Sequence, residues 1–318
     1  MGVVISCEEP KGVDVFLSDK ERERKAAILK VESEVIEAAR EFLHREGFVE
    51  LLPVIVAPIT DPLHHNTERA VIQVYGGHWH LTRSMIFHKQ AAVAVCEKIF
   101  SFSPNIRVEP PDRRGTGRHL WEFVQLDLEV RGGTRKELMD LGERLLIHVL
   151  ERVKENCSPE LKALGRELRV PERPFPVITY REARAEGGED FETLLSRKMK
   201  TPFWIIDFPI EVREFYDRED PNRPGILMDM DLVYPEGYGE ALSGGEREHL
   251  PERIRKRIEL QGLDPAQYRN LLYLAEEGLP PSAGFGIGIE RLVRYICGLV
   301  HVSEARLFPR VPGELSLI

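Results

Sequence analysis

The apolar residues near the start of the chain recur at helical spacing. Ser18 and Glu21 are three positions apart, as in a capping box that begins a helix. Apolar residues then follow one face of a helix until Gly47: Ile28, Val31, Val35, Ala39, Phe42 and Leu43. We therefore predict a helix from about Ser18 to Gly47.

The pattern changes after this helix. The segment FVELLPVIVAP is short, rich in β-branched residues and bounded by Pro58, which predicts a strand. Residues 81–102 predict a second helix, which opens near Ser84 and carries Lys89 and Gln90.

A strand, a polar loop and a second strand are predicted from NIRVE, PPDRRGTGR and HLWEFVQLDLEV. Side chains alternate between the two faces of a strand. One face of the second strand is apolar: Leu120, Val124, Leu126, Leu128 and Val130. The other face holds rings, an amide and carboxylates: Trp121, Phe123, Gln125, Asp127 and Glu129. Such a mixed face is unlike a plain solvent face, so we predict that it lines a cleft.

The rest of the chain predicts further helices and strands. Residues 134–154 form a helix, and 155–200 an irregular, partly helical insertion without a recognisable chemical motif. FWIIDFPI and ILMDMDLVYP predict strands, EGYGEALSGGER a glycine-rich return, and PSAGFGIGIERLVRYICG a strand that runs into a helix. We find no internal repeat or linker. These elements predict an α+β fold in which residues 1–318 form a single domain.

Composition limits the compartment and the partners. The chain has 318 residues and a formal net charge of −9. No apolar run approaches the roughly 20 residues that cross a bilayer, and the first residues are not typical of a secretory signal. Four dispersed cysteines suggest neither a disulfide scaffold nor a thiolate zinc site. We expect a cytoplasmic protein without a membrane partner. The acidic balance counts modestly against a nucleic-acid partner.

Alternating glycines mark the first candidate site. Gly284, Gly286 and Gly288 would leave one face of a strand bare, so that a nucleobase could lie against it, or they would only permit tight packing. The spacing is not that of a dinucleotide fingerprint, and the chain has no phosphate loop of the Walker type. Arg291 follows Glu290 at the start of a helix, where a guanidinium could hold a triphosphate or form a surface ion pair.

Further candidates come from the strand and loop before the mixed face. Arg107 and Glu109 are two apart on one strand face, and Arg118 and His119 end the loop that leads to Phe123. They offer cations for phosphate and a ring for stacking.

Three carboxylates are candidates for a metal site. Asp229, Asp231 and Glu240 could hold Mg²⁺, which takes one or two carboxylates and completes its shell with phosphate and water, or they form a solvated acidic edge. Five histidines lack clear zinc spacing, so a metal cluster is disfavoured: His64, His65, His78, His80 and His88.

In order, these segments resemble the three signature motifs of class II aminoacyl-tRNA synthetases, in the aspartyl and asparaginyl branch. The helix and strand ending at Pro58 resemble the first motif, which contributes to a dimer interface in that family. NIRVE, RHLWEF and VQLDLE resemble the second, and GFGIGIERLVRYICG with LFPRVPG resembles the third. The match spans about residues 30–313, and it implies an antiparallel sheet flanked by helices and a homodimer.

The resemblance implies an ATP site in which Arg107 holds the α-phosphate, Phe123 stacks on adenine and Arg291 packs over the base near the γ-phosphate. Other residues would support the nucleotide: Glu109, Arg118, His119, Gly286 and Gly288. Asp231 and Glu240 match the acids that bind Mg²⁺.

It also implies an amino-acid site. Arg247 matches the arginine that clamps the carboxylate of a bound aspartate, with Lys89 as its partner. Gln125 and Asp127 match positions that contact the amino end, and Ser84 opens a segment in which the glutamine expected at position 86 is isoleucine. Arg107, Arg247 and Arg291 would carry the chemistry.

We expect the short segment before the first motif to leave no room for an anticodon-binding barrel. In this respect, and in LLPVIVAPITDPL, EKIFSFSPNIRVE, EFYDRED and GYGEALSGGEREH, the chain resembles archaeal asparagine synthetases related to asparaginyl-tRNA synthetase. The implied reaction joins aspartate, ATP and free ammonia into asparagine, AMP and pyrophosphate through a β-aspartyl-adenylate, and tRNA is not expected as a partner.

Two alternatives stay open at the level of sequence. The first is a truncated aspartyl- or asparaginyl-tRNA synthetase that charges tRNA. The second is a non-catalytic regulator that binds an amino acid or an adenylate.

Overall fold

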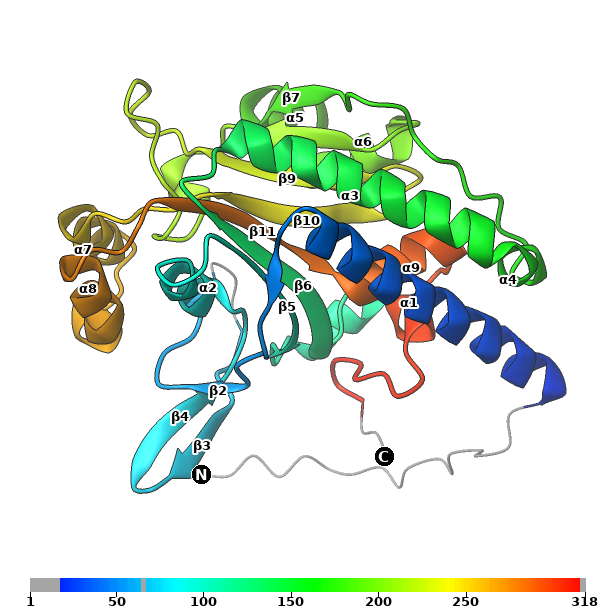
Figure 1. Cartoon of the computed structure of the whole chain (residues 1–318), viewed down its shortest axis with the longest axis horizontal. Coiled ribbons are helices and arrows are strands. Elements are labelled where there is room, and N and C mark those ends of the chain that lie inside the picture. The colour runs from blue at the N-terminus through cyan, green and yellow to red at the C-terminus, as the bar shows by residue number, and fades with distance from the viewer. Residues whose placement is uncertain (1–17, 64–66, 315–318) are drawn as a thin grey trace.

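An eight-stranded sheet organises residues 18–63 and 67–314, which the computed structural model describes (Figure 1). Its strands lie in the order β1 (Val49–Glu50), β5 (Lys98–Ile106), β6 (Glu122–Arg131), β11 (Ser282–Gly288), β10 (Gly239–Glu246), β9 (Asp229–Tyr234), β8 (Phe203–Ile206) and β7 (Val177–Thr179). Neighbours from β5 to β8 are antiparallel, and the edge pairs β1–β5 and β7–β8 are parallel. The predicted α+β class is confirmed.

The long helices α1 (Asp19–Arg45) and α3 (Arg135–Asn156) cover one face of the sheet. They are joined there by α9 (Ile289–Cys297) and by the short α4 (Ser158–Ala163), which packs beside α1. Ser18 caps α1 through the predicted capping box with Glu21. Leu126 and Leu128 of β6 point into this core and are 1% and 0% exposed. The apolar face predicted for β6 therefore faces the main core.

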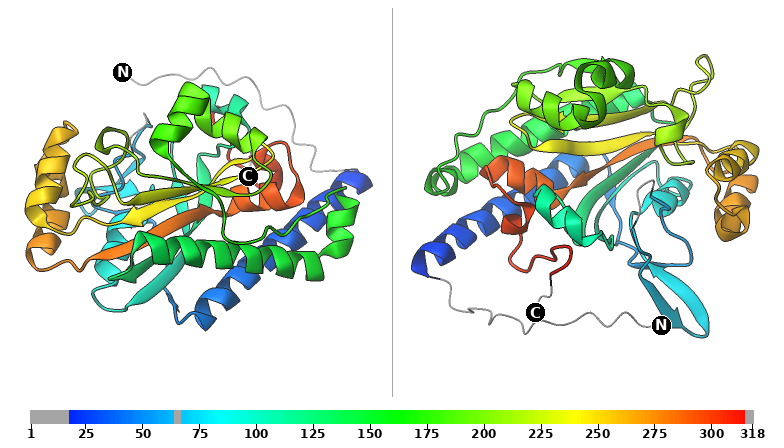
Figure 2. Two further views of the ribbon diagram at one scale, coloured as in Figure 1. Left: turned by 90° about the horizontal axis from the view of Figure 1, so that it is seen from above. Right: turned by 180° about the vertical axis from the view of Figure 1, so that it is seen from behind.

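Shorter helices flank the opposite face. At one end, α2 (Ile86–Ala92), α7 (Pro251–Leu260) and α8 (Arg269–Glu276) share a second apolar cluster. At the other end, α5 (Tyr180–Gly187) and α6 (Phe191–Lys198) pack on Phe203, Ile205 and Val233. Figure 2 (left) shows α3 and these two helices on opposite sides of the sheet. The polar face of β6, β11 and β10 remains between the two groups.

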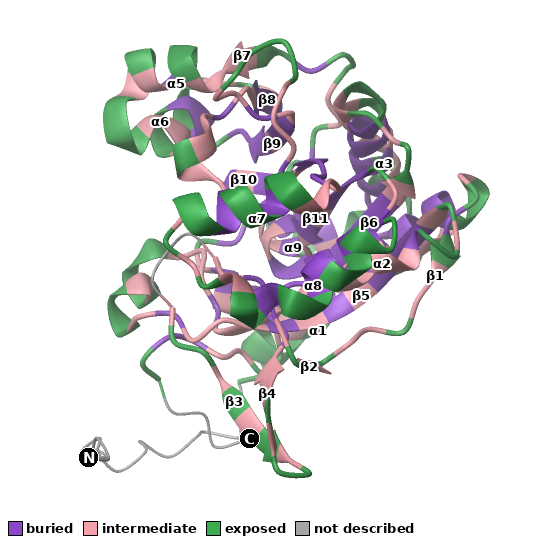
Figure 3. Cartoon of the chain, turned by 90° about the vertical axis from the view of Figure 1, so that its left-hand side faces the viewer, coloured by how far each residue is buried: buried purple, intermediate pink, exposed green. Residues whose placement is uncertain are grey.

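A small second sheet joins β2 (Val56–Ala57), β4 (Gly77–Leu81) and β3 (Val71–Val74) into a projecting hairpin (Figure 1). Figure 3 shows that β3 and β4 are largely exposed or half-buried, whereas α3 and α9 turn buried residues inward. No helix in the described part of the chain is both long and apolar enough to cross a bilayer.

Three predicted elements were wrong in extent. The strand expected up to Pro58 is two short strands in different sheets, because Pro53 between them has no N–H to donate to a ladder. The helix expected over 81–102 ends at Ala92, and the residues from Lys98 belong to β5, where alternation suits a central strand. The glycine-rich return is strand β10 itself.

Candidate active site

Two adjoining cavities open on the polar face of the sheet. One has a volume of about 260 Å³ and is lined by Phe123, and we call it the phenylalanine end. The other, of about 310 Å³, is lined by Lys89, and we call it the lysine end. Arg107, Gln125 and Glu240 line both cavities. The two ends are therefore parts of one cleft.

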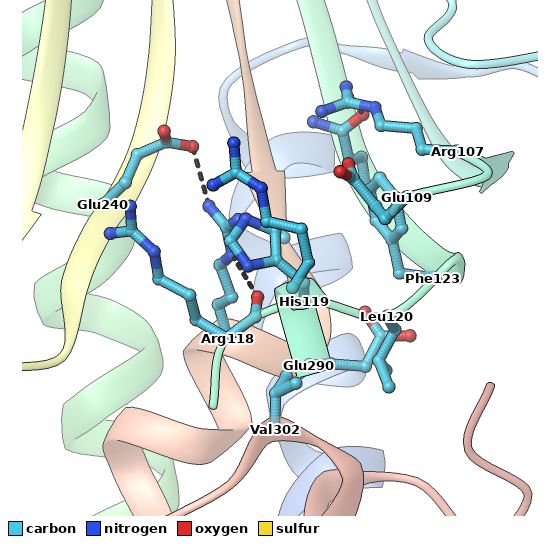
Figure 4. A pocket seen from close by; sticks show the side chains of 13 residues that line it. Arg107, Glu109, Arg118, His119, Leu120, Phe123, Glu240, Glu290 and Val302 are labelled. Carbon is cyan, nitrogen blue, oxygen red and sulfur yellow. Dashed lines mark hydrogen bonds and ion pairs between the residues drawn. The ribbon is translucent and has the colours of Figure 1, made fainter. Parts of the chain in front are cut away.

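The phenylalanine end is built on the start of β6 and the loop before it. Arg107 follows β5, and its guanidinium carbon lies 5.1 Å from the centre of the Phe123 ring, within range of a cation–π contact. The Arg107 Nε donates to the Arg83 carbonyl at 3.1 Å. Glu109 and His119 line the same cavity (Figure 4). The Phe123 ring therefore lies beside the Arg107 guanidinium.

Arg291 closes the other side of this end. It lies in the first turn of α9, where its Nε donates to the Arg118 carbonyl at 3.2 Å and its Nη1 to Glu240 Oε1 at 3.0 Å. Figure 4 draws both contacts as dashed lines. Gly288 precedes this helix, and a Cβ there would lie 3.6 Å from the Arg291 Cδ, which is ordinary contact. Phe123 and Arg291 thus line the same cavity, as predicted for a stacked base.

Glu290 connects the two walls of this end. Both of its carboxylate oxygens accept from the Val124 N–H, at 3.0 and 3.1 Å, and Arg306 lies 3.2 Å away. Burial raises the pKa of Glu290 to about 7, although Arg306 opposes the shift. Since Phe123 precedes Val124 and Arg291 follows Glu290, this contact ties the ring and the guanidinium together.

The lysine end contains every residue predicted for the amino acid: Ser84, Lys89, Gln125, Asp127 and Arg247. Lys89 is 3% exposed, and its Nζ lies 2.9 Å from Asp127 Oδ1 and 3.8 Å from Glu129 Oε2.

Arg247 is equally buried and equally paired. Its Nε lies 3.2 Å from Glu129, its Nη1 lies 3.0 Å from Asp217, and its Nη2 donates to the Gly284 carbonyl at 2.8 Å. Glu129 therefore bridges Lys89 and Arg247. The cations of this end belong to a buried network that the strands themselves hold together.

Because Gly284 and Gly286 have no side chains, polar side chains of β6 can lie against β11. A Cβ at Gly284 would lie 2.1 Å from Glu129 Oε2, and one at Gly286 would lie 2.9 Å from Gln125 Nε2. At these positions the bare strand face receives the protein's own polar side chains. Gly286, which we predicted to bind ATP, lines the lysine end, whereas Gly288 lines the phenylalanine end.

The two carboxylates predicted to bind Mg²⁺ lie on neighbouring strands. Arg213 Nη2 is 2.5 Å from Asp231 Oδ2 and its Nε is 2.9 Å from Asp229. Burial raises the pKa of Asp231 to about 6; Arg213 opposes this and the Glu240 carboxylate adds to it. Glu240 lines both cavities.

This donor set fits Mg²⁺. Two hard carboxylates without a nitrogen or sulfur ligand suit an ion that also takes phosphate oxygens and water. No group of three or more His, Cys, Asp or Glu side chains in the described ranges could hold a metal ion alone. His64 and His65, which the sequence offered with His78, His80 and His88, lie outside those ranges.

Several lining residues were not predicted. Arg113 lines the phenylalanine end, and three residues of the segment after β8 line the lysine end: Arg213, Glu214 and Asp217. Burial raises the pKa of Glu214 to about 7. The polar loop before β6 offers several arginines without a way to choose among them, and the sequence EVREFYDRED gives no spacing that would single out a site.

Comparisons with known proteins agree with this geometry. Residues 14–312 match the family described as tRNA synthetases class II (D, K and N). The asparagine–tRNA ligase of Symbiobacterium thermophilum is 34% identical over 322 residues, which cover 92% of this chain and 71% of that protein. The asparagine–tRNA ligase of Pyrococcus abyssi is 33% identical, covering 91% and 69%.

A solved structure gives the same picture. The asparaginyl-tRNA synthetase of Pyrococcus horikoshii, complexed with asparaginyl-adenylate, superposes with a TM-score of 0.85 at 32% identity. The match covers 92% of this chain and 70% of that chain.

These relatives overturn the expectation of an asparagine synthetase that uses free ammonia and excludes tRNA, because they are asparagine–tRNA ligases. The expectation against tRNA rested on the short segment before the first motif and, to a lesser degree, on the net charge of −9. The net charge averages over the whole surface and says nothing of local clusters such as the arginines of the cleft. Free ammonia was implied by the resemblance to archaeal asparagine synthetases, and no residue of the sequence was assigned to bind it.

The family match, the relatives and the superposition agree with the order of the three motifs along the sheet. The chain belongs to the class II tRNA synthetases of the D, K and N family.

Proposed function

We propose that this chain activates an amino acid with ATP, forming an aminoacyl-adenylate and pyrophosphate, and transfers the aminoacyl group from the adenylate to tRNA with release of AMP. Asparagine is the first candidate amino acid, because the relatives of known function are asparagine–tRNA ligases. The proposal includes the ATP and amino-acid roles predicted for the residues of the cleft.

One observation carries the first half of the proposal. Arg107, Gln125 and Glu240 line both ends of the cleft, so a ligand at one end adjoins a ligand at the other. With ATP between Phe123 and Arg291, its α-phosphate would lie near Arg107, where the two ends meet. An amino acid at the lysine end could then present its carboxylate at the same point. Such positioning supplies much of the acceleration of a two-substrate reaction.

The chemistry needs no covalent intermediate on the protein. A carboxylate oxygen of the amino acid attacks the α-phosphorus, the bond between that phosphorus and the oxygen bridging to the β-phosphate breaks, and pyrophosphate leaves with the electron pair. Arg107 would stabilise the charge on the α-phosphate, and Arg291 and Arg118 the charge on the departing pyrophosphate. Asp231 and Glu240 would hold Mg²⁺, which neutralises triphosphate charge when it is bound.

Aspartate is the second candidate substrate. Lys89 and Arg247 both line the lysine end, and two cationic groups there suit a side-chain carboxylate. Each already pairs with buried acids, so aspartate would have to share them with Asp127, Glu129 and Asp217. A neutral amide side chain would not compete with those acids, which favours asparagine.

Two assays separate the halves of the proposal. Exchange of labelled pyrophosphate into ATP, stimulated by asparagine more than by aspartate, would support adenylate formation. Acid-precipitable labelled asparagine after incubation with ATP and tRNA would support transfer. Pyrophosphate exchange without acid-precipitable label would support adenylate formation and rule out transfer to tRNA. If neither amino acid stimulated exchange, adenylate formation and transfer would both be ruled out, and a non-catalytic regulator that binds an amino acid or an adenylate would be favoured.

A further inference from the structure

Residues 155–200 have no recognisable chemical motif, yet a carboxylate of this insertion contacts residues of the cleft. Glu192 lies in the first turn of α6, within this insertion. Its Oε1 accepts from the Arg118 Nη1 in an ion pair, and it also accepts from the Glu240 backbone N–H at 3.1 Å. Arg118 and Glu240 both line the phenylalanine end. The insertion therefore contacts two residues of that end through the Glu192 side chain.

These contacts close into a ring of four residues from four separate segments. Arg118 donates to Glu192, Glu192 also accepts from Glu240, Glu240 pairs with Arg291, and Arg291 donates back to the Arg118 carbonyl. We call this set the four-residue ring. Glu192 is the member that does not line a cavity, so it can act on a ligand only through the others.

Backbone geometry supports a fixed position for Glu192. A Cβ at Gly239, whose φ is +76°, would lie 2.9 Å from both Arg118 Nη1 and Glu192 Oε1. The ion pair therefore packs directly on a position that favours glycine.

One turn further along α6, Ser196 secures the same place. It is 0% exposed, donates to the Tyr234 carbonyl at 2.6 Å and accepts from the Gly239 N–H at 3.0 Å. The helix is thus anchored to the turn between β9 and β10, which leads into Glu240.

We propose that Glu192 is a positioning residue for the triphosphate. It holds the Arg118 guanidinium in the position that binds ATP, while its second contact, with the Glu240 N–H, keeps the Glu192 carboxylate itself in place. This assigns a role to the insertion. The proposal rests on the proposed function, because it takes ATP as the ligand of the phenylalanine end. A side chain of Arg118 freed from Glu192 would have to lose its conformational freedom when the nucleotide binds.

The test is ATP binding to the whole chain by calorimetry, together with the KM values of both substrates in pyrophosphate exchange. Glu192→Ala should weaken ATP binding about tenfold, the size expected for the loss of one charge-assisted hydrogen bond. The KM of the amino acid should change by no more than about twofold, because Glu240 is the one member of the four-residue ring that lines the lysine end. Glu192→Gln keeps an acceptor oxygen and should restore most of the affinity.

Glu186→Ala is the matched control. Glu186 lies in the same insertion and pairs only with the exposed Lys198 among the contacts of the described residues. The Glu186→Ala substitution should leave ATP binding unchanged. A double variant, Arg118→Ala with Glu192→Ala, should bind ATP no more weakly than Arg118→Ala alone, since Glu192 acts through Arg118.

Three outcomes would overturn the proposal. Glu192→Ala could bind ATP as tightly as the unaltered chain or more tightly, which would make Glu192 a competitor for Arg118. Both KM values could rise equally with a fall in melting temperature, which would indicate a purely structural role. The double variant could lose further affinity.

If Glu192→Ala fails to fold, Glu192→Asp keeps the charge but shortens the reach, and unchanged ATP affinity in that variant would also overturn the proposal. Failure of the proposed function is distinguishable, because then the unaltered chain itself would bind no ATP.

Discussion

The charged side chains at the two ends of the cleft differ in burial and in pairing. At the lysine end, Lys89 and Arg247 are each 3% exposed and are neutralised by carboxylates of the same sheet. At the phenylalanine end, Arg118 and Arg291 side chains are 30% and 23% exposed, and part of their donor capacity faces the cavity. The lysine end is built as part of the core, whereas the phenylalanine end is built to receive a charged ligand. Substitutions at the two ends should therefore fail in different ways.

The largest effect should come from the buried network. Lys89→Ala leaves Asp127 and Glu129 buried without their cation, which should lower the free energy of unfolding by about 3–5 kcal/mol. Urea denaturation measures this value. Lys198→Ala removes an exposed lysine of a surface pair and should cost less than about 1 kcal/mol. A Lys89→Ala protein as stable as the unaltered chain would contradict the claim that this end is structural.

Arg107 should show the opposite behaviour. Arg107→Ala should lower amino-acid-dependent pyrophosphate exchange by about 10²–10³-fold, because it removes a donor aimed at charge that develops in the reaction. Its unfolding free energy should change little, since the side chain is only half-buried. Arg269→Ala, at an exposed position of α8, is the control and should leave exchange unchanged. Near-normal exchange by Arg107→Ala would refute the assigned role.

Phe123 sharpens the comparison within the phenylalanine end. Phe123→Ala should weaken ATP binding by about 1–3 kcal/mol, the value of stacking a base on an aromatic ring. Phe123→Tyr keeps the ring and should bind ATP nearly as well as the unaltered chain. Calorimetric titration with ATP compares the three proteins. Equal affinity of the alanine and tyrosine variants would show that the ring does not contact the base.

A further effect concerns Glu290 and pH. Its pKa is raised to about 7, so the folded state binds this proton more tightly than the unfolded chain does. Its contribution to stability is therefore lost as the pH rises from about 4.5 through 7. Glu290→Gln should lose less stability than the unaltered chain between pH 5 and 8, by on the order of 1 kcal/mol for each unit by which the pKa is raised. Parallel stability curves for the two proteins would contradict this assignment.

How much the sequence could predict also differs between the ends. The mixed face of β6 follows from strict alternation, so Phe123, Gln125 and Asp127 were correctly predicted to line a cleft. Arg291 could be predicted because it directly follows the glycine strand. Local patterns of this kind need no knowledge of tertiary contacts.

Contacts between distant segments could not be predicted. Arg213 and Glu192 lie in segments whose own residues show no spacing typical of a site, and each pairs with a residue of a distant segment. The strand at Lys98 was taken for helix because its apolar residues also fit a helical period, and only its pairing with β1 and β6 decides the matter. The homodimer and the single catalytic domain stay predictions.

The central claim is that one cleft binds the nucleotide at its phenylalanine end and the amino acid at its lysine end. A crystal structure of the chain with a non-hydrolysable ATP analogue and asparagine tests it most directly. We expect the base between Phe123 and Arg291, the α-phosphate beside Arg107, and the amino acid beside Lys89 and Arg247. A nucleotide bound elsewhere, or an amino acid at the phenylalanine end, would contradict the account.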